Sequence, residues 1–66
     1  MRAIIKFVFE GKTKKKTVHV IENDPNLAVR QFIKETKLPK TTEIKTIKCG
    51  IYEYQWYGPA VDAFDD

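Results

Sequence analysis

The chain of 66 residues contains no serine, only one histidine, one cysteine and three glycines. Without serine, the Ser–His–Asp arrangement of many hydrolases is excluded. Cys49 and His19 remain as a nucleophile–base pair, but we expect them on opposite faces of a sheet. Three glycines do not make a phosphate-binding loop, and the acids Asp62, Asp65 and Asp66 lack the spacing of a calcium loop. We therefore predict no enzyme activity, no cofactor and no metal site.

The sequence also lacks a run of 18 apolar residues and a signal-peptide pattern. Its single cysteine indicates a reducing compartment, because small secreted domains are usually stabilised by disulfide bonds between paired cysteines. With 42% hydrophobic residues, a chain of this length can form one small domain that folds without a partner. We expect a soluble cytoplasmic protein that does not bind a membrane.

Basic residues are missing from the last part of the chain. All twelve Lys and Arg lie within residues 1–48, against five acids there, which gives +7; residues 49–66 carry four acids, −4, and the sum is +3. This layout favours either a surface that binds polyanions or an attraction between a basic body and an acidic tail. A third interpretation is that the lysines only keep a small protein soluble.

The stretch from Asp24 to Leu38 predicts a short amphipathic helix around which the rest of the chain is organised. Asp24 is the expected N-cap and Pro25 the first helical residue, where its missing N–H is no loss. Pro39 is expected to end the helix. One face is apolar at helical spacing and consists of Ala28, Val29, Phe32, Ile33 and Thr36.

Two segments before the helix predict a β-hairpin. Residues 3–10 and 17–22 are rich in β-branched and aromatic side chains, and the polar segment between them begins at Gly11. Alternation places one set of side chains toward the helix: Ala3, Ile5, Phe7, Phe9, Val18 and Val20.

Residues 43–57 are also strand-like but contain Gly50. Either Cys49 and Gly50 form the tip of a second hairpin, or one long strand bends at Gly50. We favour the long strand. In that register Ile47, Cys49 and Ile51 face the helix, while the aromatic side chains lie on the opposite side.

These elements predict an α+β fold of two layers, ββαβ or ββαββ, with the helix packed on one face of the sheet. Residues 1–58 form the domain and residues 59–66 an acidic tail. Val61 and Phe64 are three residues apart, so the tail is a frayed end, a single helical turn or a docking peptide.

Two groups of side chains are candidate binding sites. The aromatic residues of the last strand could make an apolar patch on the uncovered sheet face, because one helix covers only one face. With neighbouring basic residues they form the predicted partner-binding set: Arg2, Lys6, Tyr52, Tyr54 and Trp56. The lysines of the hairpin tip form the predicted nucleic-acid-binding set: Lys12, Lys14, Lys15 and Lys16.

In the order and length of its elements, the chain resembles the small epsilon subunit of Gram-positive RNA polymerase and the very short phage proteins that inhibit host RNA polymerase. The resemblance rests on the hairpin AIIKFVFE…TVHVIE, the helix NLAVRQFIKE and the return strand EIKTIKCGIYEY. It implies a small regulator that binds a larger bacterial protein, and a host-cytoplasm location for a phage protein.

We therefore expect a non-enzymatic protein that binds and modulates or inhibits a larger protein, such as a bacterial polymerase or another enzyme that acts on nucleic acids. A nucleic-acid-binding module that uses the hairpin lysines and the strand aromatics is the alternative. A homodimer formed through an edge strand or the aromatic side chains is a third arrangement.

Overall fold

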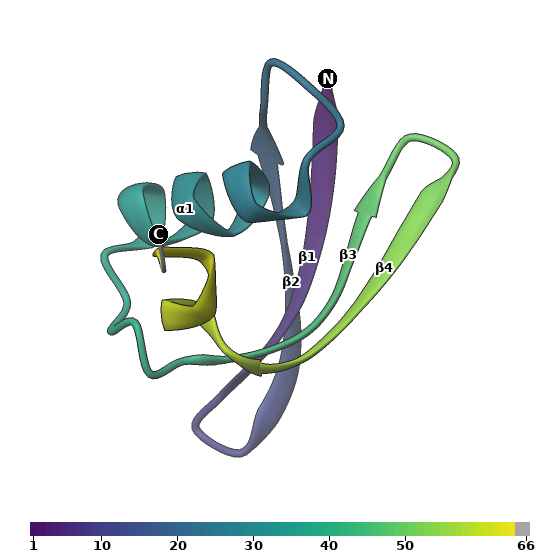
Figure 1. Ribbon diagram of the computed structural model, residues 1–66. Coiled ribbons are helices and arrows are strands. Elements are labelled where there is room, and N and C mark those ends of the chain that lie inside the picture. Colours follow the sequence, from purple (N-terminus) through teal and green to yellow (C-terminus); the bar gives the residue numbers. More distant parts are fainter. Residues whose placement is uncertain (65–66) are drawn as a thin grey trace.

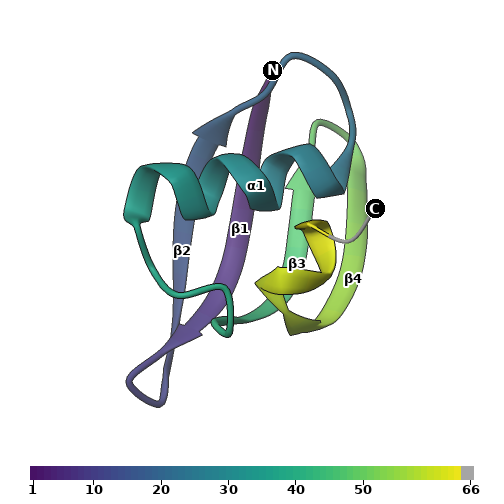
Figure 2. The same ribbon diagram turned by 60° about the vertical axis from the view of Figure 1, so that its left-hand side comes forward.

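The structure, a computed structural model, describes residues 1–64. Its element order is ββαββ followed by a short 3-10 helix, as expected for the α+β fold. The elements are β1 (Arg2–Phe9), β2 (Lys12–His19), α1 (Pro25–Thr36), β3 (Glu43–Cys49), β4 (Tyr52–Pro59) and η1 (Ala60–Phe64). The four strands form one antiparallel sheet in the order β2-β1-β3-β4. Helix α1 and η1 lie on the same face of this sheet (Figures 1 and 2).

The first hairpin turns at Glu10 and Gly11, which both have positive φ, 52° and 76°. Positive φ at both central residues is the signature of a two-residue type I′ turn. Strand β2 therefore runs over Lys12–His19, and the expectation of a strand over residues 17–22 after a polar loop is wrong at both ends. The tight turn lets the lysine-rich segment pair with β1 along its whole length, which outweighs the low strand propensity of lysine.

The core lies between α1 and the sheet, as the side-chain patterns predict. Ala3, Ile5 and Phe7 of β1 are buried, and so are the four apolar residues of the helix stripe. The Phe7 and Phe32 rings contact each other with their centroids 4.7 Å apart. The whole apolar core consists of Ala3, Ile5, Phe7, Val18, Val20, Ala28, Val29, Phe32, Ile33, Ile44, Ile47, Cys49, Ala60 and Ala63.

Both ends of α1 are set by local chemistry. The Asp24 carboxylate accepts a hydrogen bond from the Asn26 N–H at 2.9 Å, which confirms the N-cap, and Pro25 is at the start. At the other end Lys37 adopts a left-handed conformation with φ 60°, and its N–H donates to the Ile33 carbonyl. The helix thus ends at Thr36, two residues before the predicted end.

The second hairpin overturns our preference for one long strand. Cys49 pairs directly with Tyr52, so Gly50 and Ile51 form a two-residue turn. Gly50 has φ 60°, whereas Ile51 does not have positive φ, which is the φ pattern of a type II′ turn. Ile51, expected to face the helix, is instead 90% exposed at the tip.

The first part of the acidic tail is ordered as η1, the single helical turn among the three alternatives. The N–H groups of Ala60 and Val61 donate to the carbonyls of Thr42 and Lys40, both at 2.8 Å. Ala63 is buried against α1, and its carbonyl accepts a hydrogen bond from Arg30. Asp65 and Asp66 lie outside the described residues.

Candidate binding surfaces

The structure separates the five predicted partner-binding residues into two groups. Arg2 and Lys6 alternate with the buried side chains of β1 and therefore lie on the face that α1 does not cover. We call this face the open face. Its strand side chains are Arg2, Ile4, Lys6, Val8, Thr13, Lys15, Thr17, His19, Thr46, Lys48, Glu53 and Gln55.

The three aromatic residues, which we call the aromatic row (Tyr52, Tyr54 and Trp56), lie on the other face, beside α1 and η1. The expectation that they line the open face is wrong. Directly paired residues of two strands share one face, and Cys49 and Ile47 of the core pair with Tyr52 and Tyr54. The two-residue turn at Gly50 causes this, because it reverses the alternation that a continuous strand would have.

Most of the aromatic row is engaged in packing. Tyr54 and Trp56 are half-buried against the core. The Tyr54 hydroxyl donates to the Asn23 side chain, and the Trp56 indole N–H donates to the Pro59 carbonyl, both at 3.0 Å. Tyr52, at 55% exposure, stacks on Tyr54 with ring centroids 6.5 Å apart. The row therefore contributes to the fold and leaves mainly Tyr52 exposed.

The open face instead gathers positive charge around its centre. Lys6 on β1 lies directly opposite Lys15 on β2, and Lys48 on β3 pairs with Ile4, two residues before Lys6. We call Lys6, Lys15 and Lys48 the lysine triad. The three line one shallow hollow together with Ile4, Thr46 and Glu53.

The positive charge of the lysine triad is hardly balanced by nearby carboxylates. Like charges that lie directly opposite on neighbouring strands destabilise a sheet, and Lys6 and Lys15 occupy such a pair of positions. Within residues 1–64, no carboxylate lies within 4.0 Å of a triad ammonium, although Glu53 pairs with Lys48 along the strands. A surface of this kind attracts anions, because the approach of a negative group relieves the repulsion.

The predicted nucleic-acid-binding lysines do not form one patch, because β2 is a strand and its side chains alternate. Lys15 belongs to the open face, whereas Lys12, Lys14 and Lys16 pair with Phe9, Phe7 and Ile5 on the helix side. The Lys14 ammonium lies 5.2 Å from the Phe9 ring centroid, and the Lys16 ammonium 3.9 Å from the Glu35 carboxylate. Lysine therefore covers both sides of this edge strand.

Sequence reasoning missed Lys48 as part of a site. The signal was present, because a lysine between the inward-facing residues Ile47 and Cys49 must point outward. A continuous strand would place the aromatic residues on that same side, so Lys48 does not stand out in the sequence. Only the pairing of β3 with β1 brings Lys48 next to Lys6.

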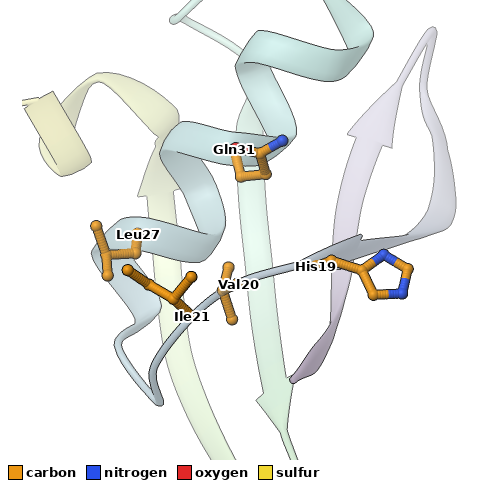
Figure 3. Close-up of a pocket in the computed structure, with 5 residues that line it drawn as sticks. All are labelled: His19, Val20, Ile21, Leu27 and Gln31. Atoms are coloured by element: carbon orange, nitrogen blue, oxygen red, sulfur yellow. The ribbon is translucent and has the colours of Figure 1, made fainter.

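A second hollow lies between the end of β2 and the first turns of α1. It is lined by His19, Val20, Ile21, Leu27 and Gln31. Figure 3 shows the His19 ring pointing away from Ile21 and Leu27. This hollow presents mainly apolar atoms and does not bring a nucleophile to the imidazole.

The one cysteine and the one histidine lie apart, as predicted. Cys49 is buried in the core, and His19 is exposed on the open face. Burial raises the pKa of the Cys49 thiol, and the Asp24 carboxylate raises it further. A buried thiol of this kind is a packing residue, because nucleophilic cysteines need an accessible thiolate.

Within residues 1–64, no cluster of His, Cys, Asp and Glu could hold a metal ion. No helix in this part of the chain has both the length and the apolar character that crossing a membrane requires. Comparison with protein families, with curated proteins and with solved structures finds no match.

Proposed function

We propose that this chain is a non-enzymatic binding protein whose open face docks on an acidic surface of a larger cytoplasmic protein and modulates that protein. The observation that carries the proposal is the lysine triad, in which Lys6 and Lys15 are directly opposed without an ion-pair partner among residues 1–64. Carboxylates of a partner would relieve this repulsion and supply complementary charge, which mainly raises the association rate and the specificity.

The composition of the open face favours a protein partner over single-stranded nucleic acid. Ile4 is 40% exposed beside the triad lysines and offers an apolar contact at the centre of the surface. Bases of single strands are held by stacking on aromatic rings, but the aromatic row lies on the helix side. The resemblance to the polymerase epsilon subunit and to phage polymerase inhibitors supports the same choice and suggests a transcription enzyme as the target.

Binding to a nucleic-acid backbone is the second candidate function. Its support is the density of lysine on β2, where Lys12, Lys14 and Lys16 lie on the helix side and Lys15 on the open face. A phosphate backbone that follows this edge could contact lysines from both sides without reading sequence.

Two triple variants with equal net charge separate these functions. One replaces the lysine triad by glutamine (Lys6→Gln, Lys15→Gln, Lys48→Gln), and the other replaces the helix-side lysines (Lys12→Gln, Lys14→Gln, Lys16→Gln). Each is used as bait in a bacterial lysate with and without nuclease, and the captured protein is then purified and titrated. We expect nuclease-resistant capture of one protein, lost in the triad variant and retained in the other.

Equal binding by both variants would refute docking through the open face. Capture that nuclease abolishes, together with equal weakening in both variants, would support the nucleic-acid function. In that case the affinity should fall steeply with salt, with a log–log slope of about −0.9 per duplex phosphate contact.

A further inference from the structure

The two edges of the sheet differ in their protection against pairing with another strand. Edge strand β2 carries Lys12, Lys14, Lys15 and Lys16, and charged side chains of this kind discourage edge-to-edge association. Edge strand β4 contains no base, and its single acid is Glu53. Figure 2 shows β2 and β4 at opposite sides of the sheet, with α1 crossing in front of β1 and β2.

The register of the second hairpin identifies the free backbone groups of β4. In a two-residue turn the flanking residues, here Cys49 and Tyr52, form a hydrogen-bonded pair. Because such pairs alternate along antiparallel strands, Tyr52 and Tyr54 direct their backbone N–H and C=O groups toward β3. Glu53 and Gln55 direct theirs outward from the edge.

Only a short part of the β4 edge can pair with another strand. Between the Thr46–Gln55 and Ile44–Gly58 pairs, two residues of β4, Trp56 and Tyr57, oppose one residue of β3. Tyr57 has φ 46°, so the strand departs from extended geometry at this bulge. A second strand can therefore add only along the segment from Tyr52 to Trp56.

We propose that β4 pairs antiparallel with β4 of a second copy of this chain, about a two-fold axis at Tyr54. In this register the outward backbone N–H and C=O groups of Glu53 bond to those of Gln55 in the second copy. By symmetry, the same groups of Gln55 bond to those of Glu53 in the second copy. On the helix side it places Tyr54 opposite Tyr54 and Tyr52 opposite Trp56, and aromatic cross-strand pairs are favourable. The indole N–H is already bonded to Pro59, so covering this ring leaves no polar group unpaired.

Charge selects this register among those that match the outward groups. A shift of two residues in one direction places Glu53 directly opposite Glu53 of the second copy, and two like charges in this position destabilise a sheet. A shift of two residues in the other direction places Glu53 opposite Tyr57 of the second copy, where the bulge interrupts the regular strand. The register with its axis at Tyr54 avoids both, because Glu53 meets the neutral Gln55.

The two-fold axis is perpendicular to the sheet, so both copies keep α1 on the same side. The dimer is then a continuous eight-stranded sheet, and the two lysine triads lie on one extended open face. Because only the segment from Tyr52 to Trp56 can pair, we expect an interface smaller than a standard protein–protein interface and a weak, concentration-dependent dimer. The pairing uses β4 alone and does not depend on what the open face binds.

Proline variants at the two edges test the pairing. Gln55→Pro removes an outward N–H of β4, and Thr17→Pro is the matched control because its N–H points outward from β2 by the same alternation. Sedimentation is measured from about 10 µM to about 1 mM, which covers weak dissociation constants. We expect a dimer for the wild type and Thr17→Pro, and a monomer for Gln55→Pro at every concentration.

If the wild type is still a monomer at about 1 mM, the proposal is overturned, because a strand edge that is able to pair should do so at such concentrations. Loss of association in both proline variants would indicate head-to-tail pairing of β2 with β4 and would overturn it as well. Circular dichroism melts identify a variant that fails to fold, and in that event the cysteine variants decide.

The cysteine variants test the register. Tyr54→Cys places one thiol of each copy opposite the other at the two-fold axis, at a non-hydrogen-bonded pair whose Cα separation of about 4.5 Å permits a disulfide. Tyr52→Cys is the matched control, because its thiol faces Trp56 of the second copy. Both variants also carry Cys49→Ala, because Cys49 lies directly opposite position 52 in the same chain and would compete for the new thiol. We expect oxidation to yield a covalent dimer at least tenfold faster for Tyr54→Cys. Equal rates, or a faster reaction of Tyr52→Cys, would refute the register.

Discussion

Lys6 and Lys15 lie directly opposite each other on β1 and β2, on the face of the sheet that α1 leaves uncovered. Two ammonium groups at this position repel each other, and the chain would be more stable with a neutral or acidic partner at either residue. Under the proposed function, this pair lowers the stability of the fold in favour of binding an anionic group. This relationship yields a prediction in which stability and binding change in opposite directions.

Lys15→Glu should stabilise the domain by about 0.2–1 kcal/mol, because it converts a like-charge pair into an opposite-charge pair. The same variant should weaken binding to the protein partner. Lys12→Glu is the control with an equal change in charge, since Lys12 faces Phe9 and no second lysine. Urea unfolding at low and high salt measures the effect, which should shrink as salt screens it. Equal effects of both variants would mean that only net charge matters.

Gly50 should be required in its position because it begins the second hairpin with φ 60°. A Cβ built on Gly50 has no heavy atom within 4 Å, so a substitution there is opposed by backbone conformation alone. Gly50→Ala should therefore destabilise the domain by about 1–2 kcal/mol. D-alanine at the same position should instead stabilise it by about 0.4–1 kcal/mol, because it restricts the unfolded chain without strain.

Thermal melts of synthetic chains carrying L- or D-alanine at position 50 would measure this difference. The opposite order of stability would indicate extended backbone at Gly50 and a continuous strand.

The helix and the core positions of β1 could be predicted because local signals there agree with the tertiary structure. Asp24, Pro25 and the apolar stripe through Phe32 all indicate the same helix, and alternation in β1 correctly identified Ile5 and Phe7 as core. The extent of β2 could not be read from composition. Its lysines pair with β1 only because the turn at Glu10 and Gly11 is two residues long.

The candidate site was harder to predict, because it depends on pairing between segments distant in the sequence. Lys6, Lys15 and Lys48 come from three strands, and only the order β2-β1-β3 brings them together. The aromatic row was predicted on the wrong face of the sheet because of one turn, the hairpin at Gly50. With Gly50 inside a strand, Tyr54 faces away from the helix; with Gly50 in a hairpin, it faces the helix side.

Trp56 should contribute to stability, since its ring packs against the core and its indole N–H donates to Pro59. Trp56→Ala should destabilise the domain by about 2–3 kcal/mol, somewhat less than for a fully buried aromatic ring. Trp56→Phe keeps a ring but loses the hydrogen bond, and should cost about 0.5–1.5 kcal/mol. Urea unfolding at low micromolar concentration separates this effect from dimerisation. Wild-type stability of Trp56→Ala would place the ring outside the packed structure.

Stability should fall in alkaline solution because of Cys49. Burial, and secondarily the Asp24 carboxylate, raises the pKa of this thiol above its ordinary value of 9.0. The native state therefore keeps the proton at a pH where the unfolded chain has lost it, and the free energy of unfolding decreases as pH rises. The contribution is complete below about pH 8.5 and is lost progressively above it, as the unfolded thiol ionises.

Cys49→Ala provides the comparison for this prediction, because alanine fits the buried site and does not titrate. The variant should be less stable than the wild type at pH 7, where the thiol fills the core. The difference should narrow between about pH 8.5 and about pH 10, since only the wild type loses stability through this group. Urea midpoints measured in steps across this range test the expectation. A constant difference at all pH values would mean that the thiol ionises equally in both states, which contradicts its burial beneath α1.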